Sequence, residues 1–299
     1  MSENVIQTHN LTKVFEGEKA VDSLDLTVPR GSVFGFLGVN GAGKTTTVRM
    51  IMGHLHPTEG EVYLLGTNPW KQTEADRCRV AYVSDNMHLP GRITPAQAIR
   101  LNASLYPEWD STLAERLHNE FDLHRSKKYQ SFSQGEKRRL CLLLAICQNA
   151  DVLILDEPAS GLDVVARHKF LNLILEQVYD GHRTVFLSSH LLSDLERVVD
   201  RLAILHQGRL HLSGTLDDLK TDVRQLHLPG TISRESLDAH FEILQYESHE
   251  QQTIVIVRDF DEERFRALGE QYGWSEAAQV HGFNLEDLFV KLVEDTKGL

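Results

Sequence analysis

The sequence predicts an α/β protein: a doubly wound, mostly parallel sheet covered by helices, followed by a small α+β domain. Three observations predict this fold. Short apolar runs alternate with helix patterns up to about residue 215, a glycine-rich turn joins the first run to a helix, and the charge changes after residue 215. Of 299 residues, 41% are hydrophobic and 25% are charged, so the chain can form two globular domains.

Four apolar runs are expected to form the strands of the parallel sheet. Consecutive apolar positions are typical of a strand that is buried on both faces, as helices on both sides of a sheet require. The runs span residues 33–37, 80–83, 152–155 and 184–187. A helix pattern follows the first run, from Lys44 to about Gly53.

Two further helix patterns, at residues 95–105 and 112–121, lie between the second run and the third. A single crossover between parallel strands needs only one helix. The extra helical segment therefore predicts a helical subdomain.

The last part of the chain differs in charge from the rest. Residues 216–299 carry 18 acidic and 8 basic residues, whereas residues 1–215 carry 25 and 23. The change follows the turn signal Ser213-Gly214, and we expect a domain boundary near residue 215. Strand patterns at 242–247 and 253–257, and helix patterns at 262–272 and 285–293, predict a small α+β domain.

The composition argues against several classes of protein. A net charge of −12 should repel nucleic acid, and the basic run Lys137-Arg138-Arg139 is expected to be only a solvated face. Three cysteines without CxxC spacing suit a reducing cytosol and argue against a zinc site or a disulfide framework. No apolar run approaches the roughly 18 residues that span a bilayer, and the polar first ten residues do not predict a signal peptide.

The segment from Gly38 to Thr45 matches the phosphate-binding pattern GxxxxGK[ST]. The pattern stands between a strand and a helix, which is the context that it requires. Its glycines allow backbone N–H groups to converge on phosphate oxygens, and the following helix directs its positive end at them. We expect Lys44 to contact the β- and γ-phosphates and the Thr45 hydroxyl to ligate Mg²⁺. The nucleotide-binding residues predicted here are Gly38, Asn40, Gly41, Ala42, Gly43, Lys44, Thr45 and Thr46.

The third apolar run ends in two carboxylates, Asp156 and Glu157. In a P-loop ATPase the aspartate at this position holds Mg²⁺ through water. The adjacent Glu157 is then placed to polarise the attacking water. An acidic pair at a strand end is weak evidence alone, because strand ends often reach solvent. Together with the phosphate-binding loop it predicts ATP hydrolysis.

Two flanking segments narrow the prediction. Phe132-Ser133-Gln134-Gly135-Glu136 precedes the Asp156 strand, and Ser160-Gly161-Leu162-Asp163 follows it. With these segments the chain resembles the ATPases of ATP-binding cassette (ABC) transporters, whose signature is usually written LSGGQ. The resemblance implies an antiparallel β portion in the ATPase core. It also implies that Ser133, Gln134, Gly135 and Glu136 act on the ATP of a second subunit, although Gln134 and Glu136 depart from the usual Gly and Gln.

The same resemblance implies roles for three separate residues. His190, after the fourth run, corresponds to a histidine that contacts the γ-phosphate. Phe15 corresponds to the aromatic residue that stacks on adenine. Asp85 stands where the family commonly has Gln, and it could meet Mg²⁺ or its water. The catalytic set predicted in this way is Glu157, His190 and Lys44, with Thr45, Asp156 and Asp85 at the metal.

Within the family, residues 105–110 and 156–163 resemble exporter ATPases that are encoded apart from their membrane partner, including antibiotic-resistance and bacitracin-type systems. This resemblance implies ATP and Mg²⁺ as cofactors, a homodimer that holds two ATP molecules, and a separate transmembrane permease at the inner face of the cell membrane. The alternatives are a soluble ABC ATPase outside transport and a nucleotide switch that does not hydrolyse ATP.

The tail, residues 216–299, contains none of these motifs. Its helix pattern places Leu285, Leu288, Phe289 and Leu292 on one face. This face either packs against the tail's own strands or docks on a second copy of the tail, and both alternatives remain open at this stage.

Overall fold

The computed structural model describes residues 3–84, 87–181, 183–274, 277–282 and 285–294. The chain divides into two compact units, Met1–Leu210 (unit 1) and His211–Leu299 (unit 2). The domain boundary predicted near residue 215 lies close to this division.

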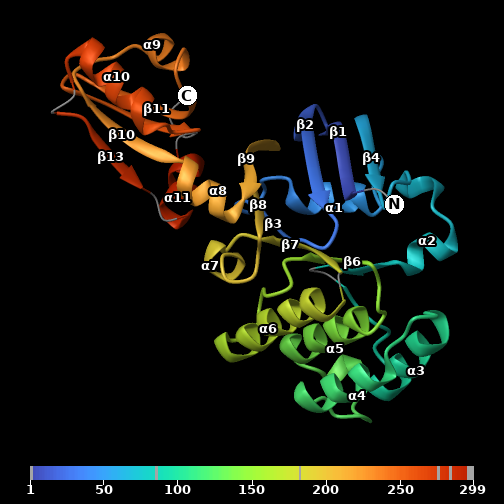
Figure 1. Cartoon of the computed structure of the whole chain (residues 1–299). Helices are drawn as coiled ribbons and strands as arrows, with labels where there is room; N and C mark the ends of the chain where they lie inside the picture. Colours follow the sequence, from blue (N-terminus) through green and yellow to red (C-terminus); the bar gives the residue numbers. More distant parts are fainter. Residues whose placement is uncertain (1–2, 85–86, 182, 275–276, 283–284, 295–299) are drawn as a thin grey trace. The chain divides into compact units, whose positions relative to one another are not determined.

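The larger sheet of unit 1 has the order β5-β6-β7-β3-β8-β9 (Figure 1). The pairs β5–β6, β6–β7, β7–β3 and β3–β8 are all parallel, which confirms the predicted parallel sheet. Its strands are β3 (Val33–Leu37), β5 (Val80–Val83), β6 (Val152–Asp156), β7 (Thr184–Ser189), β8 (Arg201–His206) and β9 (Arg209–Thr215). Every residue of β3, β6 and β7 is buried, which explains their unbroken apolar sequences.

A second sheet covers part of this core, as the family resemblance implied. It is antiparallel, with the order β2 (Glu18–Pro29), β1 (Asn4–Phe15), β4 (Glu59–Leu64). Its apolar residues share one core cluster with α1 (Lys44–Ile51) and the central strands. Within that cluster the rings of Phe34 and Phe186 stack with centroids 5.8 Å apart.

Helices α5 and α6 lie on the opposite side of the sheet from β1, β2 and β4 (Figure 1). The two helices predicted between the second and third strands are present as α3 and α4, beside α5, and form the helical subdomain. Each of the three begins at a capped residue, because the side chains of Thr94, Asp110 and Ser133 accept backbone N–H groups of the first turn. The remaining elements of unit 1 are η1 (Pro69–Lys71), α2 (Glu74–Cys78), α3 (Pro95–Leu105), α4 (Ser111–Glu120), η2 (Tyr129–Ser131), α5 (Gln134–Ile146), α6 (Val164–Gly181) and α7 (Leu192–Leu195).

The register of the parallel strands aligns their carboxyl ends. Leu37 of β3 is paired with Ser189 of β7, and Ser188 of β7 is paired with Asp156 of β6. The residues that follow these three strands therefore meet at one edge of the sheet, where ligands bind in open α/β sheets.

The turn between β8 and β9 braces that edge. The Gly208 N–H donates to the Ala42 carbonyl at 2.9 Å, and the Asp22 N–H donates to the Gly208 carbonyl at 2.9 Å. The Asp22 carboxylate also accepts from Lys19 and from Arg209, and these two bonds hold the pKa of Asp22 at about 2. The antiparallel sheet and the central sheet are thus joined directly beside the phosphate-binding loop.

Unit 2 is the predicted small α+β domain. Its antiparallel sheet has the order β11-β12-β10-β13. The strands and helices predicted at 242–247, 253–257, 262–272 and 285–293 are all present, and β10, β13, α8 and α9 had not been predicted. The elements are α8 (Leu216–Asp222), β10 (Arg224–Pro229), α9 (Arg234–Asp238), β11 (Glu242–His249), β12 (Gln252–Arg258), α10 (Glu262–Tyr272), β13 (Gln279–Gly282) and α11 (Leu285–Glu294).

Three of the four residues predicted on the apolar face of α11 are buried within the single chain, and the fourth, Phe289, is half-buried. Leu285, Leu288 and Leu292 are 1%, 0% and 5% exposed, and Lys291 of the same helix donates to Gln225 of β10 at 2.9 Å. This burial favours the first of the two alternatives for the tail, in which the face packs against its own domain.

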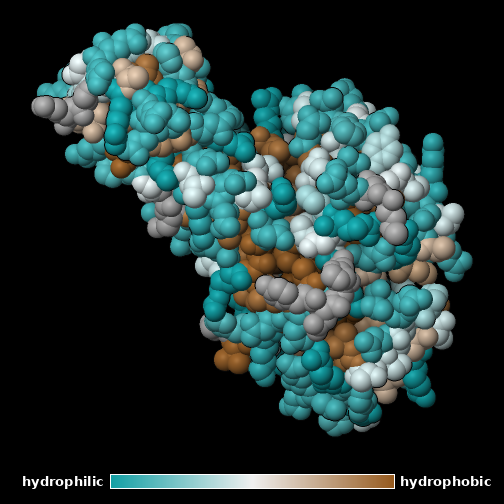
Figure 2. Space-filling model, in the orientation of Figure 1, coloured by the Kyte–Doolittle hydropathy of each residue, from teal (hydrophilic) through white to brown (hydrophobic). Residues whose placement is uncertain are grey.

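Hydrophilic residues cover most of the molecular face drawn in Figure 2, and apolar residues reach the surface in a patch in the middle of unit 1. The exposed large apolar side chains among the described residues of unit 1 are few. They are Phe15, Leu101, Leu105 and Val165.

Candidate nucleotide site

The loop between β3 and α1 requires glycine at two positions. A Cβ atom on Gly38 would lie 2.5 Å from the Leu205 carbonyl oxygen. Gly43 has a φ of +105°, and a Cβ there would lie 2.4 Å from the Ala20 carbonyl oxygen. Any side chain at these positions would push the loop away from β2 and β8. The loop backbone is therefore held close to both sheets, against Ala20 of β2 and Leu205 of β8.

The helix α1 begins directly after the loop, at Lys44. Gly43 is its N-cap and supplies no side-chain hydrogen bond to the first turn. The first N–H groups of a helix have no partner within the helix, and together with the helix dipole they attract anions. Thr45 and Thr46 are half-buried in this first turn, with the exposed Asn40 and Gly41 in the loop before it.

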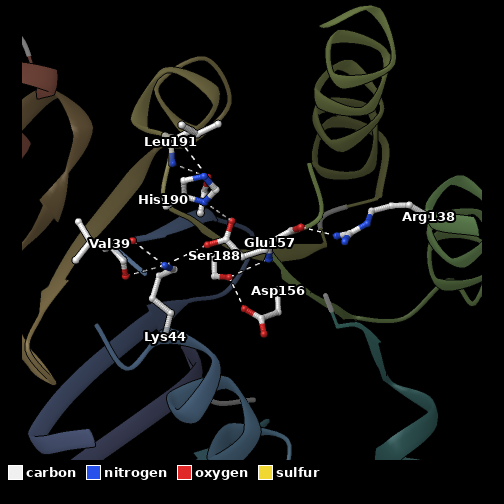
Figure 3. A network of polar contacts seen from close by, with 10 residues as sticks. Val39, Lys44, Arg138, Asp156, Glu157, Ser188, His190 and Leu191 are labelled. Atoms are coloured by element: carbon white, nitrogen blue, oxygen red, sulfur yellow. Dashed lines mark hydrogen bonds and ion pairs between the residues drawn. The ribbon is translucent and has the colours of Figure 1, made fainter. Parts of the chain in front are cut away.

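The Lys44 side chain is only 5% exposed and folds back over the loop. Its Nζ donates to the Gly38 carbonyl at 2.6 Å and to the Val39 carbonyl at 3.3 Å. It also lies 3.1 Å from Glu157 Oε1, as an ion pair without hydrogen-bond geometry. Figure 3 shows Lys44 reaching from the loop toward Glu157.

Glu157 links the loop to His190. Its Oε2 lies 2.8 Å from His190 Nδ1, and the Glu157 side chain is only 14% exposed. The three residues predicted to be catalytic therefore form one continuous chain of contacts, Lys44–Glu157–His190 (Figure 3).

Ser188 positions both neighbouring carboxylate residues. Its hydroxyl donates to Asp156 Oδ1 at 2.6 Å and accepts from the Glu157 backbone N–H at 3.0 Å. Asp156 is completely buried, and its second oxygen, Oδ2, has no hydrogen-bond partner among the described residues. No motif in the sequence predicts a role for Ser188. The only sequence signal for one was its place at the end of a strand, just before His190.

The backbone of Glu157 adopts an unusual conformation, with a φ of 50°. Few residues other than glycine adopt positive φ, and such residues cluster at functional sites. The Glu157 carbonyl accepts a hydrogen bond from Arg138 of α5. The prediction that Lys137-Arg138-Arg139 is only a solvated face is therefore wrong. All three residues are half-buried, and the Arg138 guanidinium reaches the residue that directly follows β6.

The other predicted site residues lie elsewhere. Phe15 is 46% exposed at the end of β1, and Lys13 Nζ lies 5.2 Å above its ring. Ser133 to Glu136 form the first turn of α5, and within the described residues no hydrogen bond or ion pair joins them to the loop at Gly38. Asp85 lies outside the described residues.

The fold and this edge of the sheet define a P-loop nucleotide-binding protein. The family model described as "ABC transporter" matches residues 21–160. The bacitracin transport ATP-binding protein BcrA of Bacillus licheniformis is 31% identical over 306 aligned positions, which cover 97% of each chain. The daunorubicin/doxorubicin resistance ATP-binding protein DrrA of Streptomyces peucetius is 34% identical over 73% of this chain and 67% of its own. A solved structure of an ATP-binding subunit of an ABC transporter superposes with a TM-score of 0.66 at 31% identity, over 72% of this chain and 92% of that one.

This chain belongs to the ATP-binding subunits of ABC transporters. It is a nucleotide-binding ATPase, and the resemblance that its motifs carried is confirmed.

We predict that Ser188→Ala lowers both stability and turnover. Loss of the hydroxyl leaves a buried oxygen of Asp156 without its donor, which costs about 1–3 kcal/mol in the free energy of unfolding. Turnover should fall about 10- to 100-fold, as is typical when a group that orients a metal-site ligand is removed. Urea denaturation and steady-state ATPase assays measure the two effects.

Ser189→Ala is the matched control, because among the described residues the Ser189 hydroxyl bonds to the backbone of Leu191 alone. Equal losses in the two variants would mean that Ser188 does not position the carboxylates.

Proposed function

We propose that this chain hydrolyses ATP to drive export through a separate membrane-spanning subunit, at the inner face of the cell membrane. The observation that carries the proposal is the alignment with a bacitracin transport ATP-binding protein over 97% of both chains, tail included. The second relative belongs to a drug-resistance system, which favours export. In the described part of the chain, no helix has the length and hydrophobicity needed to cross a bilayer.

The surface of the helical subdomain supports a membrane partner. Leu101 and Leu105 of α3 are 50% and 59% exposed, one helical turn apart. The same helix borders a groove of about 530 Å³. The apolar and aromatic residues of this groove include Met52, Trp70, Tyr82, Leu89 and Tyr106. An amphipathic cytoplasmic helix of the permease fits such a groove.

Lys44 and Glu157 form an ion pair in the structure. The lysine charge neutralises the carboxylate, and the Gly38 and Val39 carbonyls hold the lysine in place. An ATP bound in the loop offers Lys44 phosphate oxygens of greater negative charge. Lys44 then turns to the β- and γ-phosphates, and Glu157 is freed to accept a proton from the attacking water.

His190 and Phe15 complete the proposed ATP contacts within one chain. His190 already bonds Glu157, so a modest rotation directs its ring toward a γ-phosphate while the carboxylate keeps it oriented. The Phe15 ring is 46% exposed, and in this proposal its exposed part stacks on adenine.

The site also fits Mg²⁺. Asp156 Oδ2 is buried without a hydrogen-bond partner, while Ser188 holds Oδ1 in place, so one carboxylate oxygen remains for a water on the ion. Asp156 would hold the ion through that water, and the Thr45 hydroxyl would bind the ion directly. When bound, the ion neutralises charge on the β- and γ-phosphates.

The signature turn, Ser133–Glu136, supplies the part of the proposed ATP site that comes from a second chain. Because no described contact joins Ser133–Glu136 to the loop at Gly38 in one chain, we propose that two chains pair head to tail around two ATP molecules. Ser133 Oγ and the Gly135 N–H of one chain would then meet the γ-phosphate held by the other. Gln134 is exposed at the same helix end.

We predict that Lys44→Ala loses most nucleotide binding, because the loop loses its only phosphate-directed charge. MgATP at a hundredfold excess over its dissociation constant should stabilise the wild type by about 2.7 kcal/mol. Differential scanning calorimetry should show little stabilisation of the variant, whereas Lys71→Ala, at an exposed lysine, should respond as the wild type does. An unchanged response in Lys44→Ala would exclude the loop as the phosphate site.

We predict that Glu157→Gln binds MgATP but turns over at least about 100-fold more slowly, because the attacking water loses its general base. The uncleaved ATP should hold two chains together as a dimer in size-exclusion chromatography. Wild-type turnover in this variant would remove Glu157 from the proposed role.

We predict that Leu105→Glu weakens the permease complex severalfold without changing the ATPase activity of the isolated chain, because a charge on α3 opposes docking of an apolar helix. The measurement is the amount of a co-expressed membrane-spanning subunit that copurifies in detergent. Val290→Glu, at a 43% exposed position of α11, serves as control. Equal recovery with Leu105→Glu and with the wild type would place the permease elsewhere.

A further inference from the structure

The signature turn, Ser133–Glu136, contains a negatively charged residue at the N-terminus of α5. In the proposed dimer this helix end faces the ATP of the second chain. Glu136 is the third residue of α5, and the family's usual residue at this position is the neutral Gln. A helix N-terminus attracts phosphate through its N–H groups and dipole. A carboxylate in the same turn opposes that attraction, because like charges repel over several ångströms even near the surface.

Glu136 cannot turn away without dismantling the cap of α5. Its Oε2 accepts from the Ser133 N–H at 2.7 Å, while the Glu136 N–H donates to Ser133 Oγ at 3.2 Å. These reciprocal bonds form a capping box. They tie the carboxylate to Ser133, the residue whose hydroxyl is proposed to meet the partner's ATP.

Lys127 meets this carboxylate at both oxygens. Its Nζ donates to Glu136 Oε1 at 2.9 Å and to Oε2 at 3.1 Å. The ammonium also lies 5.1 Å from the centroid of the Phe132 ring, within the range of a cation–π contact. The Glu136 carboxylate and the Phe132 ring thus both hold the Lys127 ammonium beside the signature turn.

The hydrogen bond from Lys127 is the largest cause that lowers the pKa of Glu136, followed by that from the Ser133 backbone. The carboxylate is therefore charged at neutral pH, and its charge is balanced locally. Glu136 is 20% exposed and Lys127 is 36% exposed, so the pair lies at the surface that a second chain would cover.

We propose that Lys127 is a positioning residue that neutralises Glu136, so that a signature turn containing glutamate can accept the ATP bound to a second copy of this chain. The inference rests on the proposed ATP-sandwiching dimer. A purely structural ion pair would contribute to the cap of α5 and leave ATP recognition unchanged.

The experiment measures ATP-driven dimerisation of the full-length chain in the Glu157→Gln background, by size-exclusion chromatography across a series of MgATP concentrations. Lys127→Met removes the charge and keeps most of the length of the side chain. Lys127→Arg preserves the charge, and Lys128→Met at the exposed neighbouring lysine is the matched control. Steady-state turnover of the same variants with Glu157 intact gives a second readout.

Lys127→Met should raise the MgATP concentration for half-maximal dimerisation, and the KM for ATP, by about tenfold or more. Adding Glu136→Gln to Lys127→Met should restore most of this loss, since the charge to be neutralised is gone. Lys127→Arg and Lys128→Met should behave as their parent does. The MgATP-induced thermal shift of the monomer should be unchanged throughout, which shows that each variant is folded with its own loop intact.

Two results would overturn the inference while the proposed dimer stands. One is unchanged dimerisation and KM in Lys127→Met. The other is an equal loss in Lys127→Met with and without Glu136→Gln, which would mean that the lysine acts independently of the glutamate charge. If the Glu157→Gln parent binds ATP but never dimerises, the sandwich itself is wrong and the inference fails with it.

Discussion

The parallel register of β6, β7 and β3 is the constraint on which the site depends. Asp156 is paired with Ser188, and Ser189 with Leu37, so three segments far apart in the chain end at one edge of the sheet. Ser188 then bonds Asp156 through its hydroxyl and receives the Glu157 N–H. A slip of one residue along either strand would reverse every side chain and separate the carboxylates from the loop at Gly38.

Each half of the proposed composite site contains a lysine–glutamate pair. In the nucleotide pocket the pair is Lys44–Glu157, and in the signature turn it is Lys127–Glu136. The first pair is buried, and ATP would break it by competing for Lys44. The second is nearer to solvent and would persist, because its glutamate also belongs to the cap of α5. The same kind of ion pair thus has two roles. Lys44–Glu157 would respond to nucleotide, and Lys127–Glu136 would balance charge locally.

The sequence predicted four strands of the central sheet and two helices of the helical subdomain, whereas β8 and β9 of the same sheet had not been predicted. Apolar runs such as 33–37 became buried strands, and the pattern at 95–105 became a helix with the same bounds. Unit 2 was predicted only in part. The strands β10 and β13 carry polar residues between their apolar ones, and β13 is exposed at every position, so neither shows the apolar run by which strands are recognised. Arg138 was misjudged because a basic run on one helix does not reveal which of its members reaches a neighbouring strand.

By itself, the sequence determined which residues carry the chemistry. The phosphate-binding loop is a contiguous motif, because its backbone geometry requires glycine at fixed positions. Asp156 and Glu157 are recognisable because they directly follow an apolar strand. Only the tertiary structure decided which groups hold them. The bond of Ser188 to Asp156 spans 32 residues and that of Arg138 to Glu157 spans 19. Contacts between separate elements depend on strand order, register and side-chain conformation, and no local pattern in the sequence encodes these.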